Sequence, residues 1–308
     1  MYYIGIDAGG TKTSFSLYTE SGEMVDNTRR QSCHFMRVGY EKMAEILMEG
    51  VMSLVENHKI DVSEVVVSFG LAGYGRDAKI RNAIDQALSE KFRGLHYCVY
   101  NDVEAALSGA FKGEQGIILI AGTGSIAYAI NDHEMIRAGG FGYAIGDEGS
   151  AYWIAKRMLE TVTKMEDGRL GRSSLYDYLL ERLSLHDGFE LIGYVMNTLG
   201  NERDQIASLA QYLFEAAQLG DSAAISIYKD AAKELSELVK AVSKKEDGQI
   251  NVAYYGGVFK SGDFILLPLK ECLGTAYHLM EPTETPEFGA FILAQRDYKS
   301  KVEPKNCL

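Results

Sequence analysis

Asp7 is followed closely by two glycines, a threonine and a lysine, in the stretch GIDAGGTKT that contains Gly9, Gly10, Thr11 and Lys12. Glycine tolerates positive φ angles and lets a ligand come close to the backbone. Successive N–H groups in such a turn converge on an anion, and a threonine hydroxyl adds a donor. The stretch therefore predicts a phosphate-binding turn, with Lys12 either adding a point charge or lying in solvent. A tight turn without a ligand is the alternative.

A second turn of this kind, AGTGS, contains Gly122, Thr123 and Gly124. Two such turns at matching positions favour a pair of phosphate clamps over two unrelated hairpin turns. A carboxylate beside a bound phosphate repels it unless a cation lies between them, and Mg²⁺ meets that need, often through water. Asp7 is thus a candidate metal ligand, although it could instead cap its own turn.

Asn101 and Asp102 stand where an expected strand, LHYCVY, meets an expected helix. Asp102 could cap that helix, which needs no further function. It could equally act as a general base, since phosphoryl transfer needs mainly positioning, charge neutralisation and a carboxylate at the nucleophile.

The stretch GGFGYAIGDEGSAYWIA is a glycine-rich loop leading into a helix. Phe141 could stack on the apolar face of a sugar ring, and Gly142 allows a sharp turn beside it. Asp147 and Glu148 stand near the helix start, where helix capping is the alternative to ligand binding. Trp153 lies within the helix and is expected in the core.

Alternating and helical apolar patterns define the elements that must position these residues. Strands are expected at YYIGID, TSFSLYT, EMVDNTRRQ, SEVVVSFGL and LHYCVY, and again at GIILIAG, IAYAI, EMIRAGG, QINVAYYGG and TAYHLM. Helices are expected at 40–57, around 80–92, at 102–111, in a block over 148–243, at DFILLPLKECL and at PEFGAFILAQRDY.

The same order, three strands followed by helix, strand, helix, strand and helix, occurs twice. This repeat predicts a duplicated α/β fold with a ligand cleft between its halves. We expect an N-terminal domain over 1–112, with a helix at 285–300 packing back on it. A C-terminal domain is expected over 113–284, with a helical insert at about 149–244.

The composition is that of a globular protein, with 46% hydrophobic and 24% charged residues. The formal net charge of −12 disfavours nucleic acid as a partner. No apolar run reaches membrane-spanning length and the start lacks a basic signal region, so we expect a cytoplasmic protein that does not enter a membrane. The four cysteines have no metal-binding spacing, and a zinc site at Cys33 and His34 is disfavoured because no further ligands cluster there.

Five motifs together resemble the sugar-kinase branch of the acetate kinase, hexokinase, Hsp70 and actin superfamily. They are GIDAGGTKT, YNDVEAALSGA, IAGTGS, GGFGYAIGDEGSAYWIA and YYGGVFKSG, and the likeness extends from Met1 to about Gln295. Within that branch the N-acetylglucosamine kinase group of the BadF/BadG ATPase family is the most similar. The resemblance implies two RNase H-like domains around an interdomain cleft that binds ATP and a sugar.

The resemblance also implies roles for single residues. Asp102 would be the catalytic base that accepts the proton of the sugar hydroxyl. The sugar would be bound by residues of two motifs, and the nucleotide by glycines on the adenosine side. These residues are Asn101, Phe141, Gly142 and Asp147 for the sugar, and Gly220, Gly256 and Gly257 for the nucleotide.

One segment departs from the family, since SCHFMRVG has His34 where the N-acetylglucosamine kinases have asparagine. A neutral imidazole can replace one hydrogen bond of that amide. Arg37 could bind a substrate carboxylate in a bidentate manner, and N-acetylmuramic acid carries such a group. The sugar is therefore expected to be N-acetylglucosamine, N-acetylmuramic acid or both.

The resulting expectation is an ATP- and Mg²⁺-dependent kinase for the 6-hydroxyl of an amino sugar, a small-molecule substrate; a homodimer is allowed. One alternative is an ATPase activator of a dehydratase or reductase, but those relatives hold an iron–sulfur cluster through cysteines that this chain does not reproduce. A repressor-type sugar kinase is disfavoured because its cysteine-rich zinc motif is missing. A nucleotide-dependent binding protein would not need Asp102 together with GGFGYAIGDEG.

Overall fold

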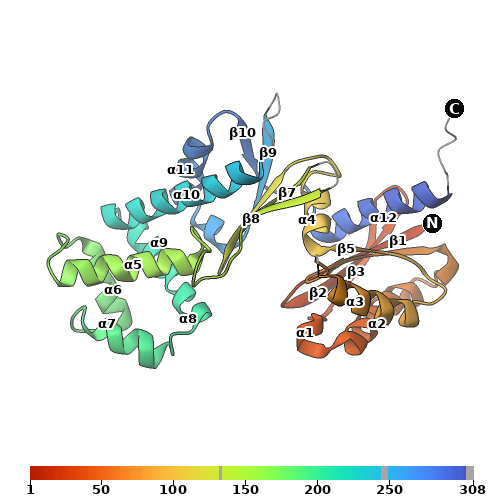
Figure 1. The fold of residues 1–308 in the computed structure, drawn as a ribbon, viewed down its shortest axis with the longest axis horizontal. Helices are drawn as coiled ribbons and strands as arrows, with labels where there is room; N and C mark the ends of the chain where they lie inside the picture. The colour runs from red at the N-terminus through yellow and green to blue at the C-terminus, as the bar shows by residue number, and fades with distance from the viewer. Residues whose placement is uncertain (76, 132–133, 244–248, 303–308) are drawn as a thin grey trace. The chain divides into compact units, whose positions relative to one another are not determined.

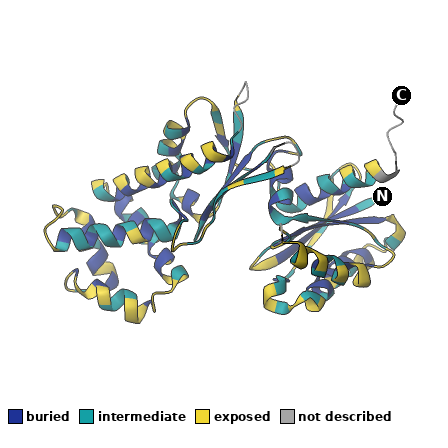
Figure 2. Ribbon diagram, in the orientation of Figure 1, coloured by how far each residue is buried: buried dark blue, intermediate teal, exposed yellow. Residues whose placement is uncertain are grey.

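The computed structural model describes residues 1–75, 77–131, 134–243 and 249–302 (Figure 1). The chain divides into two compact units. The first unit combines residues 1–115 with the C-terminal segment from Pro282, and the second spans residues 116–281. Buried residues line the sheet and the inward helix faces of each unit (Figure 2).

The first unit is built on a mixed five-stranded sheet in the order β3-β2-β1-β4-β5. β1 pairs antiparallel with β2 and parallel with β4. β2 and β3 are antiparallel, whereas β4 and β5 are parallel. The strands are β1 (Tyr2–Ala8), β2 (Lys12–Thr19), β3 (Met24–Gln31), β4 (Val65–Leu71) and β5 (His96–Asn101).

Helices cover both faces of this sheet. Ile4 and Ile6 of β1 pack in one core with buried residues of α2 and α3, whereas Tyr3 packs in another with Phe291 of α12. The alternation of side chains along a strand puts Asp7 on the same face as Tyr3, the face that α12 covers. The helices are α1 (Phe35–Val38), α2 (Tyr40–Asn57), α3 (Ala78–Lys91), α4 (Asp102–Ala110) and α12 (Pro286–Val302).

Glycines let α4 and α12 approach each other and the sheet. A Cβ on Gly289 of α12 would lie 1.8 Å from the Ala105 carbonyl oxygen of α4. A Cβ on Gly5 would lie 1.9 Å from the Glu287 carbonyl oxygen. The backbones themselves are therefore in contact here, and this contact fixes α4, whose first residue is Asp102.

The second unit repeats the first. Its sheet has the order β10-β9-β6-β7-β8, in which the first strand of the unit again lies between its second and fourth. β6 is antiparallel to β7 and parallel to β9, as in the first unit. The strands are β6 (Ile117–Ala121), β7 (Ser125–Asn131), β8 (Glu134–Gly139), β9 (Ile250–Tyr255) and β10 (Tyr277–Met280). The predicted duplicated fold is confirmed.

Helices are inserted in the second unit between β8 and β9, and one more follows β9. The sequence predicted the first set only as an undivided helical block. They are α5 (Ala151–Glu166), α6 (Ser174–Leu183), α7 (Glu190–Gly193), a π-helical turn (Tyr194–Thr198), α8 (Arg203–Ser208), α9 (Ala210–Gln218) and α10 (Ser222–Val242), followed by α11 (Asp263–Leu273). Short 3₁₀ turns lie at Val62–Glu64 and Gly257–Ser261.

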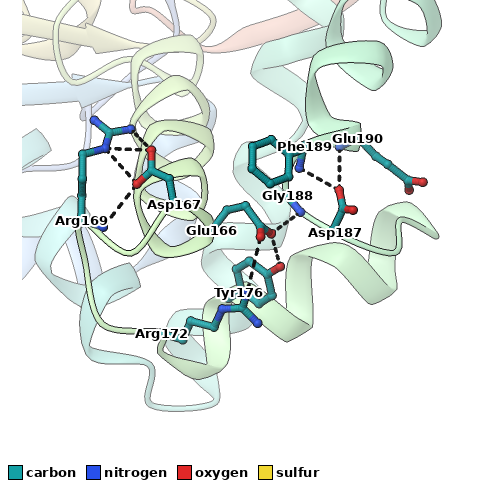
Figure 3. Close-up of polar contacts among 9 residues, drawn as sticks. All are labelled: Glu166, Asp167, Arg169, Arg172, Tyr176, Asp187, Gly188, Phe189 and Glu190. Carbon is teal, nitrogen blue, oxygen red and sulfur yellow. Dashed lines mark hydrogen bonds and ion pairs between the residues drawn. The ribbon is translucent and has the colours of Figure 1, made fainter.

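Glu166 ties the insert together at the end of α5 (Figure 3). Its carboxylate accepts hydrogen bonds from the Tyr176 hydroxyl of α6 and, at 2.6 Å, from the Gly188 N–H. Arg172 Nη2 lies 3.4 Å from Glu166 Oε1. These hydrogen bonds, Tyr176 first, lower the pKa of Glu166. The carboxylate is thus occupied in holding the segment after α6 against α5.

Within the described residues, no helix combines the length and the apolar character that crossing a membrane requires.

Candidate functional site

The turn between β1 and β2 holds the first glycine-rich motif. The Gly9 N–H donates to the Lys12 carbonyl at 3.1 Å, and the Ser32 hydroxyl donates to the Gly9 carbonyl at 3.0 Å. Neither Gly9 nor Gly10 has a positive φ, so the expected need for left-handed backbone is absent here. Open space surrounds the position of a Cβ on Gly10, and Thr11 is exposed. Glycine in this turn therefore leaves room beside the backbone.

Asp7 is the titratable group most strongly affected near this turn. Burial raises the pKa of Asp7 to about 7, and the charges of Glu287 and Asp102 add to the effect, whereas Lys12 opposes it. Glu287, in the first turn of α12, was not among the residues predicted from the sequence. Two further carboxylates that raise the pKa of Asp7 favour a cation beside it.

The residues that the structure describes form no group of three or more His, Cys, Asp or Glu side chains arranged to hold a metal ion directly. The accumulated negative charge around Asp7 nevertheless fits a hydrated divalent cation. Mg²⁺ commonly keeps several waters and contacts protein through one or two carboxylates. Asp7 is thus a candidate to hold Mg²⁺ through water molecules rather than as part of a full set of direct protein ligands.

The junction of β5 and α4 distinguishes the roles of Asn101 and Asp102. Asn101 is the N-cap: its Oδ1 accepts from the Val103 N–H at 2.9 Å, and its own N–H donates to Glu104 Oε2 at 2.8 Å. Asn101 Nδ2 also donates to the Tyr74 carbonyl at 3.3 Å. The alternative that Asp102 caps α4 is therefore wrong. Asn101, expected to bind sugar, has its side chain largely committed to this local structure.

Asp102 is the first residue of α4 and is free of the capping role. Burial raises the pKa of its carboxyl, while the hydrogen bond from the Val103 N–H and the charge of His34 oppose the rise. A carboxylate that is partly withdrawn from water is a stronger base than an exposed one. Its environment suits proton abstraction.

His34 lies close enough to affect Asp102, and its tautomer can be assigned. Its Nδ1 accepts a hydrogen bond from the Met36 N–H at 3.3 Å, so the neutral ring carries its proton on Nε2. The ring stacks on Phe35 at 5.0 Å, and Phe35 stacks in turn on Tyr40. His34 therefore presents a fixed donor. Arg37 of α1, the helix that His34 precedes as N-cap, is exposed.

The second glycine-rich turn is bound to the start of α5. The Gly122 N–H donates to the Gly124 carbonyl at 2.9 Å, and the Ala151 N–H donates to the Gly122 carbonyl at 2.8 Å. The Ser125 hydroxyl donates to the Glu148 carbonyl at 2.6 Å. As in the first turn, neither glycine has a positive φ, and open space adjoins Gly122. Thr123 lies between them and is partly exposed.

The loop from Gly139 to Gly149 carries the expected sugar-binding residues. Phe141 is 65% exposed, with the Arg137 guanidinium 5.4 Å from its ring centre, and Gly142 has a φ of +90°. α5 begins only after Ser150, which is its N-cap. The alternative that Asp147 caps this helix is therefore wrong.

Asp147 is buried and paired with a residue that the sequence did not suggest. Arg203 Nη2, at the start of α8, lies 3.0 Å from Asp147 Oδ2. A Cβ on Gly124 would lie 2.5 Å from Arg203 Nη2 and 2.7 Å from Asp147 Oδ2. The ion pair therefore packs directly on the second glycine-rich turn, and the absent side chain of Gly124 makes room for it.

A mainly apolar pocket of about 220 Å³ lies in the second unit next to this turn. Gly256 has a φ of +115°, and a Cβ there would lie 2.2 Å from the Ala121 carbonyl oxygen. Gly257 lines the pocket, which supports the expectation of a ligand beside it. The lining residues are Ala151, Ile154, Ala210, Gln211, Phe214, Tyr228, Gly257, Val258, Lys260 and Ser261.

Gly220 has a structural role at the end of α9. It follows α9 with a φ of +86°, and it is not among the residues that line the pocket. Asp221, next to it, accepts from the Leu175 N–H at 2.8 Å and from two N–H groups of α10. Gly220 thus ends one helix and leads into a residue that caps two others.

The described cysteines lie apart from these residues or are enclosed. Cys33 and Cys98 are buried in the first unit, and Cys272 lies in α11. Cys307 is outside the described residues. Buried thiols of this kind do not suit ligands shared at the surface of two chains.

The sequence is similar to a family model and to curated kinases along nearly its whole length. The model of the BadF/BadG/BcrA/BcrD ATPase family matches residues 4–294. An N-acetyl-D-glucosamine kinase of Dictyostelium discoideum is 29% identical over 317 residues, covering 96% of this chain and 98% of the relative. An N-acetylmuramic acid/N-acetylglucosamine kinase of Clostridium acetobutylicum is 30% identical over 308 residues, covering 96% and 99%.

Solved structures share the fold. A candidate N-acetylglucosamine kinase from Chromobacterium violaceum has a TM-score of 0.70 at 24% identity, covering 96% of this chain and 99% of that one. A ROK family glucokinase from Streptomyces griseus has a TM-score of 0.53 at 18% identity, covering 96% and 100%. At these identities the likeness concerns the fold alone.

Proposed function

Since the chain belongs to the BadF/BadG/BcrA/BcrD ATPase family, we propose that it is an ATP-dependent kinase acting on an amino sugar. The acceptor is the 6-hydroxyl of N-acetylglucosamine, of N-acetylmuramic acid or of both. The relatives named as kinases of these sugars support this choice of substrate class.

The observation that carries the proposal is the state of Asp102. Asn101 is the N-cap of α4, so the Asp102 carboxylate, although it accepts from the Val103 N–H, is not needed to cap the helix. Its raised pKa makes it a better proton acceptor than an exposed aspartate. A single carboxylate in this condition is what transfer of a phosphoryl group to a hydroxyl requires.

In the proposed reaction Asp102 accepts the proton of the sugar hydroxyl while the hydroxyl oxygen forms a bond to the γ-phosphorus of ATP. The bond between that phosphorus and the bridging oxygen breaks, and ADP leaves. Asp102 then returns its proton to solvent. His34 Nε2–H donates to the sugar and holds it beside the carboxylate.

The nucleotide is proposed to use the two glycine-rich turns and the apolar pocket. Backbone N–H groups within Gly9–Lys12 and Gly122–Gly124, other than those of Gly9 and Gly122 that bond inside each turn, bind its phosphates. The base enters the pocket beside Gly257, where Phe214 and Tyr228 supply apolar surface. Mg²⁺, held through water by Asp7, supplies neutralisation of phosphate charge when bound.

The sugar is proposed to be bound by His34 and by the loop of the second unit. Phe141 offers an exposed ring to the apolar sugar face, and Asp147 offers a carboxylate to its hydroxyls. Gly142 contacts the sugar through its backbone. Arg37, exposed on α1, binds the lactyl carboxylate when the sugar is N-acetylmuramic acid.

A panel of sugars tests this function. The protein is incubated with ATP, Mg²⁺ and N-acetylglucosamine, N-acetylmuramic acid, glucosamine or glucose, and sugar phosphate is detected by mass spectrometry. We expect phosphorylation of at least one N-acetylated sugar, well above that of glucose. ATP hydrolysis that no sugar stimulates, with no sugar phosphate formed, would contradict the proposal and favour an ATPase.

A further inference from the structure

We propose that Arg203 is a positioning residue of the sugar site, which holds the Asp147 carboxylate in its binding orientation. The inference rests on the proposed function, because it takes Asp147 to contact the sugar. It assigns a role in substrate affinity to the helical insert, which supplies Arg203 from α8.

The carboxylate of Asp147 needs such a partner. The side chain of Asp147 is only 4% exposed, and its Oδ2 accepts from Arg203 Nη2 at 3.0 Å. In the part of the chain that the structure describes, its Oδ1 accepts no hydrogen bond, so this oxygen stays free for a hydroxyl. A buried carboxylate without a cation would be protonated or would turn toward water. Arg203 thus fixes the carboxylate through one oxygen and leaves the other oxygen for a ligand.

The position of the pair is fixed from several sides. The backbone of Asp147 has a φ of +62°, a conformation that few side chains other than Asp and Asn adopt readily. The Arg203 guanidinium lies 5.9 Å from the Tyr143 ring, which packs edge-on against Tyr152 of α5. The backbone of Gly124 closes the remaining side, since a Cβ there would meet both charged groups.

The pair is poorly built for stability alone. Arg203 Nε is buried and has no hydrogen-bond partner in the described structure, although the side chain as a whole is 37% exposed. Ion pairs with unsatisfied buried donors are often no more stabilising than apolar residues of similar size. Orientation of Asp147 explains this arrangement better than stability of the fold.

The test compares Arg203→Met, Arg203→Lys and Asp147→Asn in steady-state kinetics with N-acetylglucosamine and ATP. We expect Arg203→Met to raise the KM for the sugar about tenfold or more, as for coupled charged pairs. The KM for ATP and kcat at saturating sugar should stay within about threefold. Arg203→Lys should restore part of the sugar affinity. Because both single changes remove the same contact, the double variant Arg203→Met/Asp147→Asn should be no worse than Asp147→Asn alone.

Arg182→Met is the matched control, since Arg182 is an ion-paired arginine of the same insert, 3.2 Å from Glu215 Oε2. It should leave the KM for the sugar unchanged.

An unchanged KM for the sugar in Arg203→Met overturns the inference. An equal rise in the KM values for sugar and ATP with a lowered Tm also overturns it, because that result would mark a structural residue. If Arg203→Met does not fold, wild-type sugar affinity in Arg203→Lys overturns the inference, and lowered affinity with normal ATP affinity supports it. If the wild-type protein phosphorylates no sugar of the panel, the proposed function itself has failed.

Discussion

Asp102 and Asp7 are two carboxylates of the first unit whose surroundings suit different roles. Both carboxyls have raised pKa values because both are withdrawn from water. Asp102 also accepts the Val103 N–H, which stabilises its charge, whereas Asp7 feels the negative charges of Glu287 and Asp102. Asp102 thus suits the role of proton acceptor. Asp7 suits the role of a metal-binding residue, whose negative charge a cation would offset.

This difference predicts that Asp7→Asn stabilises the protein in a pH-dependent way. The pKa of Asp7 is about 7 when folded, above its ordinary value of 3.8. A raised folded pKa favours the folded state at low pH, and that contribution is lost as pH rises from about 4 to about 7. Asparagine does not titrate, so the variant loses no such contribution to stability over this pH range. The Tm of Asp7→Asn should therefore exceed that of the wild type by more at pH 8 than at pH 5, without added divalent cation.

Thermal unfolding of both proteins by circular dichroism measures this difference. Asp26→Asn is the control, since Asp26 is only partly buried and its hydrogen bond with His58 lowers its pKa, so its small effect has the opposite sign. A Tm difference for Asp7→Asn that is equal at both pH values would show that the Asp7 carboxyl is not destabilised in the fold. The same variant should have reduced activity, since the proposed Mg²⁺ site is lost.

At the scale of elements, the contact of α4 and α12 determines where Asp102, the proposed catalytic carboxylate, lies. Gly289 and Gly109 allow the two helix segments to meet backbone to backbone. α12 comes from the end of the chain but completes the unit formed by its beginning. Any shift of α12 should therefore displace α4 and with it Asp102.

We predict that Gly289→Ala is strongly destabilising. The added methyl group would lie 1.8 Å from the Ala105 carbonyl oxygen and 2.3 Å from the Gly109 nitrogen, which are backbone atoms that cannot move alone. Overpacking of this kind costs about 1–3 kcal/mol or more. Chemical denaturation should show a lower free energy of unfolding, and kcat should fall because α4 moves. Gly171→Ala is the control, since its Cβ position is open and its φ is not positive. Wild-type stability in Gly289→Ala would contradict the described packing.

The elements themselves were largely predictable. The helix expected at 40–57 has those bounds as α2, because its apolar residues recur with helical spacing and a glycine precedes it. The repeated order of strands was also correct, since each core strand is apolar and bounded by turn residues. The internal division of the insert was not predicted, because consecutive amphipathic helices form one continuous apolar pattern.

The contacts of the candidate site were less predictable than its motifs. Glycine-rich turns and Asp102 stand out locally, but Arg203 meets Asp147 across 56 positions and Glu287 affects Asp7 from the other end of the sequence. No local pattern marks such partners. The glycines predicted to bind phosphate at positions 9, 10, 122 and 124 have no positive φ: open space adjoins Gly10 and Gly122, whereas the missing side chain of Gly124 makes room for Arg203 and Asp147.

At the scale of the whole molecule, duplication explains why each unit carries one glycine-rich turn after its first strand. The first unit adds the proposed carboxylate base and a candidate metal ligand. The second unit adds the proposed sugar-binding loop, an apolar pocket and the insert that holds Arg203. The proposed kinase thus uses one fold twice for different parts of one reaction.

The central claim is that Asp102 is the general base of phosphoryl transfer, and Asp102→Asn tests it most directly. Asparagine keeps the size of the side chain and cannot accept the proton. We predict that kcat with N-acetylglucosamine and ATP falls about 10²-fold or more. The sugar dissociation constant from isothermal titration calorimetry should change by less than about threefold. A variant that turns over at the wild-type rate would contradict the account.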